Sequence, residues 1–390
     1  MDRMSARLVC YATCVAMLII LTSLTACGVK PQSSTIDAVS IEQTPIENQF
    51  SIGFCWSYAT IGLIESNHKV KTGENINLSE EAIGYIRMRN ELKEIATAFR
   101  KGSISLQTAL ERTRGKSLEG WVVRAGDHEK SRDAMELIDD FGLVPESIWS
   151  VKFDSPESAR RLKSAIQEPF KALLTAGEQS ISNESLDAVL TVEGAFPSTP
   201  PSSLTIDGKT MTSQEYARDV IGFKSSDYVA IRARNAVDSL RLIQIAKKTL
   251  AAGYSVPLSF GVSYDNLKDG LFLAPNFKAA DLDANTELVN SIIGLDGGHA
   301  VLITDFVNIN GVEGAIPDED LQQEVRKSAE QLAYVKFKNS WGAGSSTNEV
   351  GKNVISSPDG YYRMDLGYIK AIAAKGRFGI VVPRSLVQSM

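Results

Sequence analysis

The segment Gln49-Phe50-Ser51-Ile52-Gly53-Phe54-Cys55-Trp56-Ser57-Tyr58-Ala59 decides the fold prediction. Cys55 stands where a loop containing Gly53 gives way to a helical pattern. A thiol at a helix N-terminus faces unpaired backbone N–H groups and the positive end of the helix dipole. Both favour the nucleophilic thiolate, and such sites lower a thiol pKa from about 8.5 to roughly 3.5–7.5. The upstream Gln49 could place an amide N–H beside the backbone N–H of Cys55, and two such donors form an oxyanion hole.

Three segments, taken in chain order, resemble the active-site motifs of the papain-like cysteine peptidases. The first is Gln49 to Trp56, and its lead-in Pro45-Ile46-Glu47-Asn48 is also similar to that family. The second is Gly297-Gly298-His299-Ala300-Val301, and the third is Lys338-Asn339-Ser340-Trp341-Gly342. A Cys-Trp pair alone would be weak evidence, whereas three motifs in the right order are far more specific.

The resemblance assigns a chemical task to each residue. Cys55 is expected to attack a peptide carbonyl as thiolate, and His299 to hold and deliver the proton. Asn339 is expected to fix the histidine tautomer, and Gln49 to contribute to the oxyanion hole. Trp341, expected to shield the His299–Asn339 hydrogen bond, and Gly298 are the substrate-binding candidates. No metal and no cofactor is implied.

The order of predicted elements favours an α+β fold of the papain-like two-lobe type. Helical patterns cover 55–73, most of 80–113, 130–141 and 236–253. Strand patterns cover 256–262, 299–307, 334–337, 360–364 and 378–382. The resemblance implies a helical lobe and an antiparallel, barrel-like lobe with the substrate cleft between them.

Residues 154–235 have no counterpart in a minimal papain and are expected to form a partly helical insertion. They account for a separation between Cys55 and His299 well above the roughly 130–150 residues usual for papain relatives. The segments 142–147 and 211–217 resemble the bleomycin hydrolase and aminopeptidase C branch. Members of that branch trim N-termini by blocking the cleft with their own C-terminus, so internal cleavage and terminal trimming both stay open here.

Some positions depart from the family pattern. Ile52 stands where relatives usually carry a disulfide cysteine, so that disulfide is excluded. Phe50 and Phe54 replace small residues beside the oxyanion glutamine and the nucleophile, which predicts an altered cleft shape. A charged segment at 316–321, between the histidine and asparagine motifs, is expected to be a surface helix.

The N-terminus reads as a lipoprotein export signal. Arg3 and Arg7 precede an apolar run from 8 to 24, and Leu24-Thr25-Ala26-Cys27 resembles the lipobox of bacterial lipoproteins. We therefore expect a signal peptide over 1–27, a flexible tether over 28–45 and a peptidase domain over 46–390. Acyl chains on Cys27 would anchor the exported protein to a membrane of the bacterial cell envelope. An ordinary signal peptide or an uncleaved anchor helix is the alternative.

Composition narrows the function further. The net charge of −6 is modest and gives no reason to expect a nucleic-acid partner. Of the four cysteines, Cys10 and Cys14 would leave with the signal and Cys27 would be lipidated, so Cys55 is expected to be the free thiol of the mature protein. The sequence predicts a cysteine peptidase acting on a peptide or protein substrate. The competing interpretations are another thiol acyl-transfer enzyme, such as an amidase or transglutaminase, and a catalytically silent peptide-binding lipoprotein.

Overall fold

The computed structural model describes residues 41–50, 52–114, 130–151, 153, 155–176, 181–274, 293–308, 332–347 and 354–388. Every described residue belongs to one compact unit of the chain, 36–390. The predicted signal peptide, the lipobox and the charged segment 316–321 lie outside the described residues, and the domain boundaries stay predictions. None of the described helices is long and apolar enough to cross a membrane.

The α-helices of the described residues have the following bounds: α2 Cys55–Thr72, α3 Glu80–Arg100, α4 Leu106–Arg114, α5 Lys130–Phe141, α6 Pro156–Ala165, α7 Gln167–Thr175, α8 Asn183–Leu190, α9 Ser213–Glu215, α10 Ala236–Ala251, α13 Leu366–Ala374 and α14 Arg384–Gln388. A π-helical turn, Tyr216–Ile221, continues α9. Helices 55–73, 130–141 and 236–253 agree with prediction, whereas the pattern over 80–113 is broken between α3 and α4.

The strands have the following bounds: β1 Ser203–Ile206, β2 Lys209–Thr212, β3 Tyr228–Ala233, β4 Val256–Val262, β5 Leu267–Lys268, β6 Leu271–Phe272, β7 Gly297–Asn308, β8 Leu332–Lys338, β9 Gly344–Thr347, β10 Val354–Ser357, β11 Tyr361–Asp365 and β12 Phe378–Pro383. Eight of the described strands form one sheet in the order β3-β12-β4-β7-β8-β11-β6-β5. Neighbours pair antiparallel except β11 and β6.

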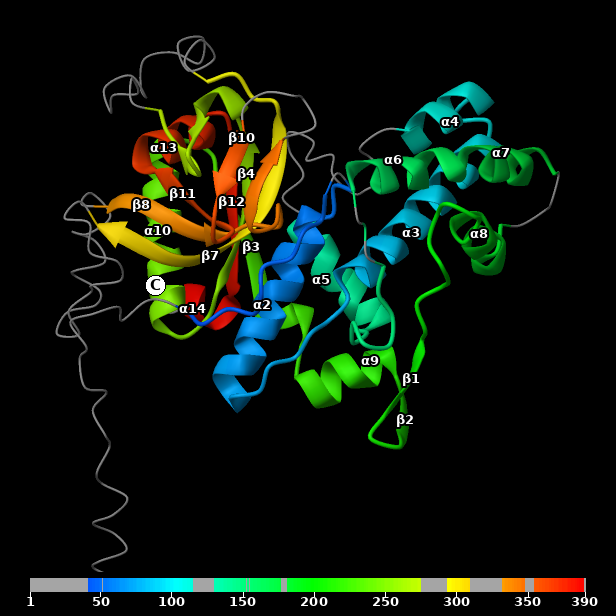
Figure 1. Cartoon of the computed structure of the whole chain (residues 1–390), viewed down its shortest axis with the longest axis horizontal. Helices are drawn as coiled ribbons and strands as arrows, with labels where there is room; N and C mark the ends of the chain where they lie inside the picture. The colour runs from blue at the N-terminus through cyan, green and yellow to red at the C-terminus, as the bar shows by residue number, and fades with distance from the viewer. Residues whose placement is uncertain are drawn as a thin grey trace, which may run out of the picture. The chain divides into compact units, whose positions relative to one another are not determined.

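Helix α2 joins two hydrophobic cores. It packs against β7 and β4 on one side and against α3 and α5 on the other (Figure 1). Every residue from Ser57 to His68 is therefore buried, whichever helix face it occupies. Gly53 enters the helix with a φ of 76°, and Gly73 ends it in the left-handed region at a φ of 78°, conformations that glycine adopts without strain.

Each lobe has its own core. In the helical lobe, α2, α3 and α5 share one cluster with insertion residues such as Phe170, Leu186 and Phe196. In the sheet lobe, α10 and α13 pack on the large sheet around residues such as Phe337 and Tyr368. The predicted α+β two-lobe fold is confirmed, with the sheet open at β3 and β5 in the described part of the chain.

The predicted insertion contributes to both lobes. Helices α7 and α8 pack on α3, and β1 and β2 form a separate hairpin. Strand β3 pairs with β12 as the edge of the large sheet, which the sequence did not indicate. The described C-terminal residues pack on the same side: α14 contacts α10, and the Arg384 guanidinium donates to the carbonyls of Ser226 and Tyr228.

Candidate active site

The nucleophile lies at the first position of α2. Cys55 is 2% exposed and is the free cysteine of the described residues. Phe54, the N-cap residue, provides no side-chain hydrogen bond to the first turn, and that turn contains no acidic residue. The positive end of the helix dipole is therefore not neutralised by a carboxylate of the first turn, which favours a thiolate at Cys55.

Phe54 packs away from the cleft, against the helical core. Its side chain is fully buried in the cluster formed with α3, and its ring occupies the place where Gly84 of α3 lacks a side chain. A Cβ atom built on Gly84 would lie 2.3 Å from the Phe54 ring. The glycine therefore accommodates the phenylalanine that replaces a small residue beside the nucleophile.

Substitution of Gly84 by alanine tests this fit. We expect Gly84→Ala to destabilise the fold by about 1–3 kcal/mol, because the added methyl forces the Phe54 ring out of a closely packed site. Chemical denaturation would measure the loss. Gly73→Ala is the comparison: nothing lies within 4 Å of its Cβ position, so its cost comes from its positive φ alone. An unchanged stability of Gly84→Ala would contradict the packing described here.

His299 lies in β7, which crosses α2 near the nucleophile. Cys55 and Ala59 of α2 form a small apolar cluster with Ala300, the residue that follows His299. His299 Nε2 lies 2.7 Å from Asn339 Oδ1. Because an amide oxygen only accepts, Nε2 carries the proton and Nδ1 is left for the thiol. The structure thus brings His299 and Asn339 into direct contact, and Ala300 brings the histidine strand against the nucleophile helix.

Aromatic rings enclose the imidazole. Trp341 stacks on His299 with ring centroids 4.5 Å apart and planes inclined by 20°, and Phe260 of β4 approaches edge-on at 5.9 Å. His299 is 4% exposed. Burial lowers the pKa of His299 to about 4, while the hydrogen bond to Asn339 opposes that shift. An imidazolium therefore needs an anion beside it, and a thiolate at Cys55 would be that anion.

Gln49 is held beside the asparagine motif. Its backbone N–H donates to the Ser340 carbonyl over 2.9 Å, and the Ser340 hydroxyl donates to Gln49 Oε1 over 2.8 Å. Because Gln49 Oε1 accepts this hydrogen bond, the NH₂ group of Gln49 points away from the Ser340 hydroxyl and can donate to another group. Gly342 N–H also donates to the Glu47 carbonyl, so the segment before α2 is tied to the segment after β8. The sequence predicted no site role for Ser340, because its contact with Gln49 depends on how distant segments fold together.

The two substrate-binding candidates also lie at this site. Trp341 is half-buried and stacks on His299, and its predicted shielding of the His299–Asn339 hydrogen bond stays a prediction. Gly298 precedes His299 in β7 and faces Gly261 in the register of β4. Among the described residues, no three His, Cys, Asp or Glu side chains are placed so that they could hold a metal ion together.

Known proteins resemble part of this chain in sequence. The profile of the papain family of cysteine proteases matches residues 32–84. A probable cysteine protease, RD19B from Arabidopsis thaliana, is 45% identical over 40 residues, and chymomexicain from Jacaratia mexicana is 40% identical over 40 residues. These matches cover 10% of this chain, 11% of the Arabidopsis protein and 19% of chymomexicain.

The fold comparison extends over most of the chain. The crystal structure of PepW from Lactobacillus rhamnosis HN001 superposes with a TM-score of 0.55 at 16% identity, covering 90% of this chain and 83% of PepW. At this identity the likeness concerns the fold. The chain therefore has a papain-like fold and resembles the papain family of cysteine proteases in the segment that carries its nucleophile.

Proposed function

We propose that this protein is a cysteine peptidase that hydrolyses peptide bonds by a Cys-His-Asn mechanism. The observation that carries the proposal is the 2.7 Å contact between His299 Nε2 and Asn339 Oδ1, in a strand packed beside the N-terminus of the Cys55 helix. A histidine whose tautomer is fixed by an amide oxygen presents its other nitrogen to a thiol.

The proposed reaction uses each residue in turn. The Cys55 thiolate attacks the peptide carbonyl carbon, and the developing oxyanion accepts hydrogen bonds from the Cys55 backbone N–H and the Gln49 amide. The His299 imidazolium then gives its proton to the leaving amine, which departs and leaves a thioester. Neutral His299 next takes a proton from water as the water attacks the thioester, and collapse of this second intermediate releases the acid product and regenerates the thiolate–imidazolium pair.

Two competing functions receive less support. Amidases and transglutaminases usually pair the histidine with an aspartate, whereas the partner of His299 is Asn339. A silent peptide-binding protein would be favoured if Phe50 and Phe54 crowded the cleft. Phe54 is instead buried in the helical core, and the half-buried Phe50 packs against the same core.

The position of the described C-terminal residues bears on whether the protein cuts peptides internally or trims their ends. In the described residues, α14 is held on α10, and Arg384 bonds the backbone beside β3 at the edge of the sheet. Strand β7, with His299, is separated from β3 by β12 and β4. This arrangement favours a cleft that the described C-terminal residues leave open, and hence internal cleavage.

A peptide library tests the proposed activity. The purified protein lacking the signal peptide would be incubated with proteome-derived peptides whose termini are blocked, and new termini would be identified by mass spectrometry. Internal cuts in blocked peptides, prevented by a thiol-reactive epoxide, are expected. The absence of any cut in blocked and unblocked peptides would contradict the peptidase proposal.

We further propose that lipid on Cys27 anchors the protein to a membrane of the bacterial cell envelope. The lipobox-like Leu24-Thr25-Ala26-Cys27 after an apolar run supports this proposal. In a bacterial host, we expect the wild-type protein in the membrane fraction and Cys27→Ala to lose the acyl mass on its mature N-terminus. Cys10→Ala, within the predicted signal, is the control and should behave as wild type. Equal membrane association without any acyl group would favour an uncleaved anchor helix.

A further inference from the structure

Four glutamates lie near one another where the two lobes join, beside a cavity that Asn339 also lines. This acid cluster comprises Glu47, Glu65, Glu80 and Glu81. Glu65 is 3% exposed, Glu80 4% and Glu81 6%. Several buried carboxyl groups in one place are costly unless they are protonated or paired with a cation. The cluster therefore needs an explanation beyond packing.

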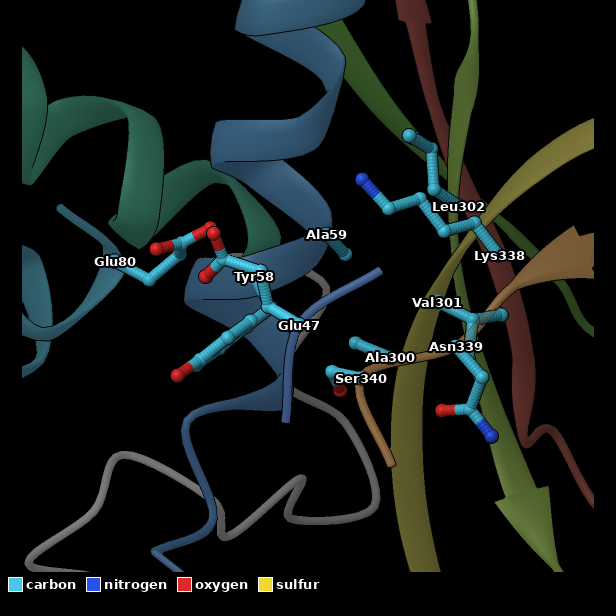
Figure 2. Close-up of a pocket in the computed structure, with 10 residues that line it drawn as sticks. All are labelled: Glu47, Tyr58, Ala59, Glu80, Ala300, Val301, Leu302, Lys338, Asn339 and Ser340. Carbon is cyan, nitrogen blue, oxygen red and sulfur yellow. The ribbon is translucent and has the colours of Figure 1, made fainter. Parts of the chain in front are cut away.

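Glu80 and Glu47 line a small cavity at this junction. The cavity measures about 20 Å³ and is also lined by Tyr58 and Ala59 of α2, by Ala300 to Leu302 of β7, and by Lys338 to Ser340. Figure 2 shows the carboxyl groups of Glu47 and Glu80 directed toward each other and Lys338 extending from β8 toward α2. Glu80 Oε2 is buried and has no hydrogen-bond partner among the described residues. A cavity of this size has room for about one water molecule.

Lys338 is the positive charge that faces the acid cluster in the part of the chain described. Its ammonium donates to Thr44 Oγ1 over 2.8 Å, and Thr44 Oγ1 donates to Glu65 Oε2 over 2.8 Å. The other oxygen of Glu65 accepts the backbone N–H of Leu78, just before α3. Lys338 of β8 is thus linked through Thr44 to Glu65 of α2, and Glu65 is linked to the segment that precedes α3.

The same cluster is bonded to the first turn of the nucleophile helix. The Ser57 hydroxyl donates to the Glu80 carbonyl, and the Tyr58 hydroxyl donates to the Glu81 carboxylate. On the other side, Lys338 directly precedes Asn339, which contacts His299, and Ser340, which contacts Gln49. A shift of Lys338 relative to α2 would therefore displace the histidine partner relative to the nucleophile.

The surroundings of the buried carboxyl groups favour their protonated forms. Burial raises the pKa of Glu65 and of Glu81 to about 7. Burial also raises the pKa of Glu80 well above its ordinary value, and Glu47, Glu65 and Glu81 add to that rise. Lys338 opposes the rise at Glu65, whereas Glu146 adds to that at Glu81. Burial also lowers the pKa of Lys338, and the facing carboxylates oppose that change.

We propose that Lys338 and the acid cluster form a proton-dependent lock between the lobes, with Lys338 as a positioning residue for Asn339. While the cluster keeps its protons, one ammonium balances it and Asn339 stays against His299. When the cluster loses those protons, uncompensated negative charge accumulates in a buried junction and the lobes separate there. The proposal rests on the proposed function only in its consequence for catalysis.

The sign of the pH effect follows from the raised pKa values. The folded state holds protons on Glu65 and Glu81 that the unfolded state has released, so this contribution to stability is complete below the ordinary glutamate pKa of 4.5. It is lost as the pH rises through about 7. We expect the wild-type melting temperature to fall between about pH 5 and 8.

Charge-removing variants test the lock. Glu80→Gln keeps the shape of the side chain but removes one acid, so it should flatten the fall in melting temperature and extend rapid epoxide labelling of Cys55 by about one pH unit on the alkaline side. Lys338→Gln should steepen the fall and reduce kcat/KM at least about 10-fold with little change in KM. The double variant has one carboxyl group fewer that must stay protonated without the ammonium, so it should recover part of the stability and of the activity lost in Lys338→Gln. Glu168→Gln, an exposed glutamate on α7, is the matched control.

The pH profiles of the variants test the lock, whereas peptide cleavage tests the proposed peptidase activity. Titration of His299 itself is common to all the variants, so only a difference between their profiles reports on the lock. Profiles of Glu80→Gln and Lys338→Gln that coincide with those of wild type and Glu168→Gln would overturn the lock, whether or not peptides are cleaved. Shifted melting profiles in a protein that cleaves nothing would support the lock and reject the peptidase.

Discussion

Replacement of Cys55 by alanine is expected to lower kcat/KM for peptide hydrolysis by at least about 10⁴-fold, because the thioester can no longer form. The fold should survive, since Cys55 already packs with Ala59 and Ala300 and alanine suits a helix. Hydrolysis of a fluorogenic peptide selected from the library would measure the loss.

Thermal unfolding is the control for that experiment. Cys55→Ala should unfold within a few degrees of wild type, so that its inactivity cannot be attributed to a damaged fold. Residual cleavage within 10-fold of the wild-type rate by Cys55→Ala would contradict the assignment of the nucleophile.

Replacement of His299 by alanine is the second large expected effect. We expect a loss of at least about 10³-fold in kcat/KM, because Cys55 loses the base that holds its proton and the leaving amine loses its acid. The two residues act as a unit, so the double variant Cys55→Ala/His299→Ala should be about as inactive as Cys55→Ala alone. The three rate constants can be compared at one pH in the same assay.

The other described histidine provides a matched control. His68 lies near the end of α2, far along the helix from Cys55, and has no contact with Asn339 or Trp341 among the interactions described. His68→Gln should keep the wild-type rate. A loss from His68→Gln as large as that from His299→Ala would show that any altered histidine disturbs the fold, and it would contradict the specific role of His299.

Local sequence predicted the elements that carry the site. The largely apolar segment after Gly298 predicted a buried strand with His299 at its entry, and β7 covers it. The helical pattern after Cys55 and the stop at Gly73 agree with α2 and its left-handed cap. These predictions succeed because hydrophobic period and glycine conformation act over a few neighbouring residues.

Contacts between distant segments could not be predicted in this way. The sequence showed a phenylalanine beside the nucleophile, but only the fold places Gly84 of α3 beneath it. The helical pattern over 55–73 did not reveal that every residue from Ser57 to His68 is buried, which happens because both lobes pack on α2. The same enclosure buries Glu65 and thereby makes the acid cluster.

Labelling of the purified protein with a thiol-reactive epoxide over a pH series tests the central claim most directly, with the modified residue identified by mass spectrometry. We predict rapid labelling of Cys55 near neutral pH that is lost in His299→Ala, as required for an assembled thiolate–imidazolium pair. Slow labelling that increases only toward an ordinary thiol pKa of about 8.5, and is the same in His299→Ala, would contradict the account.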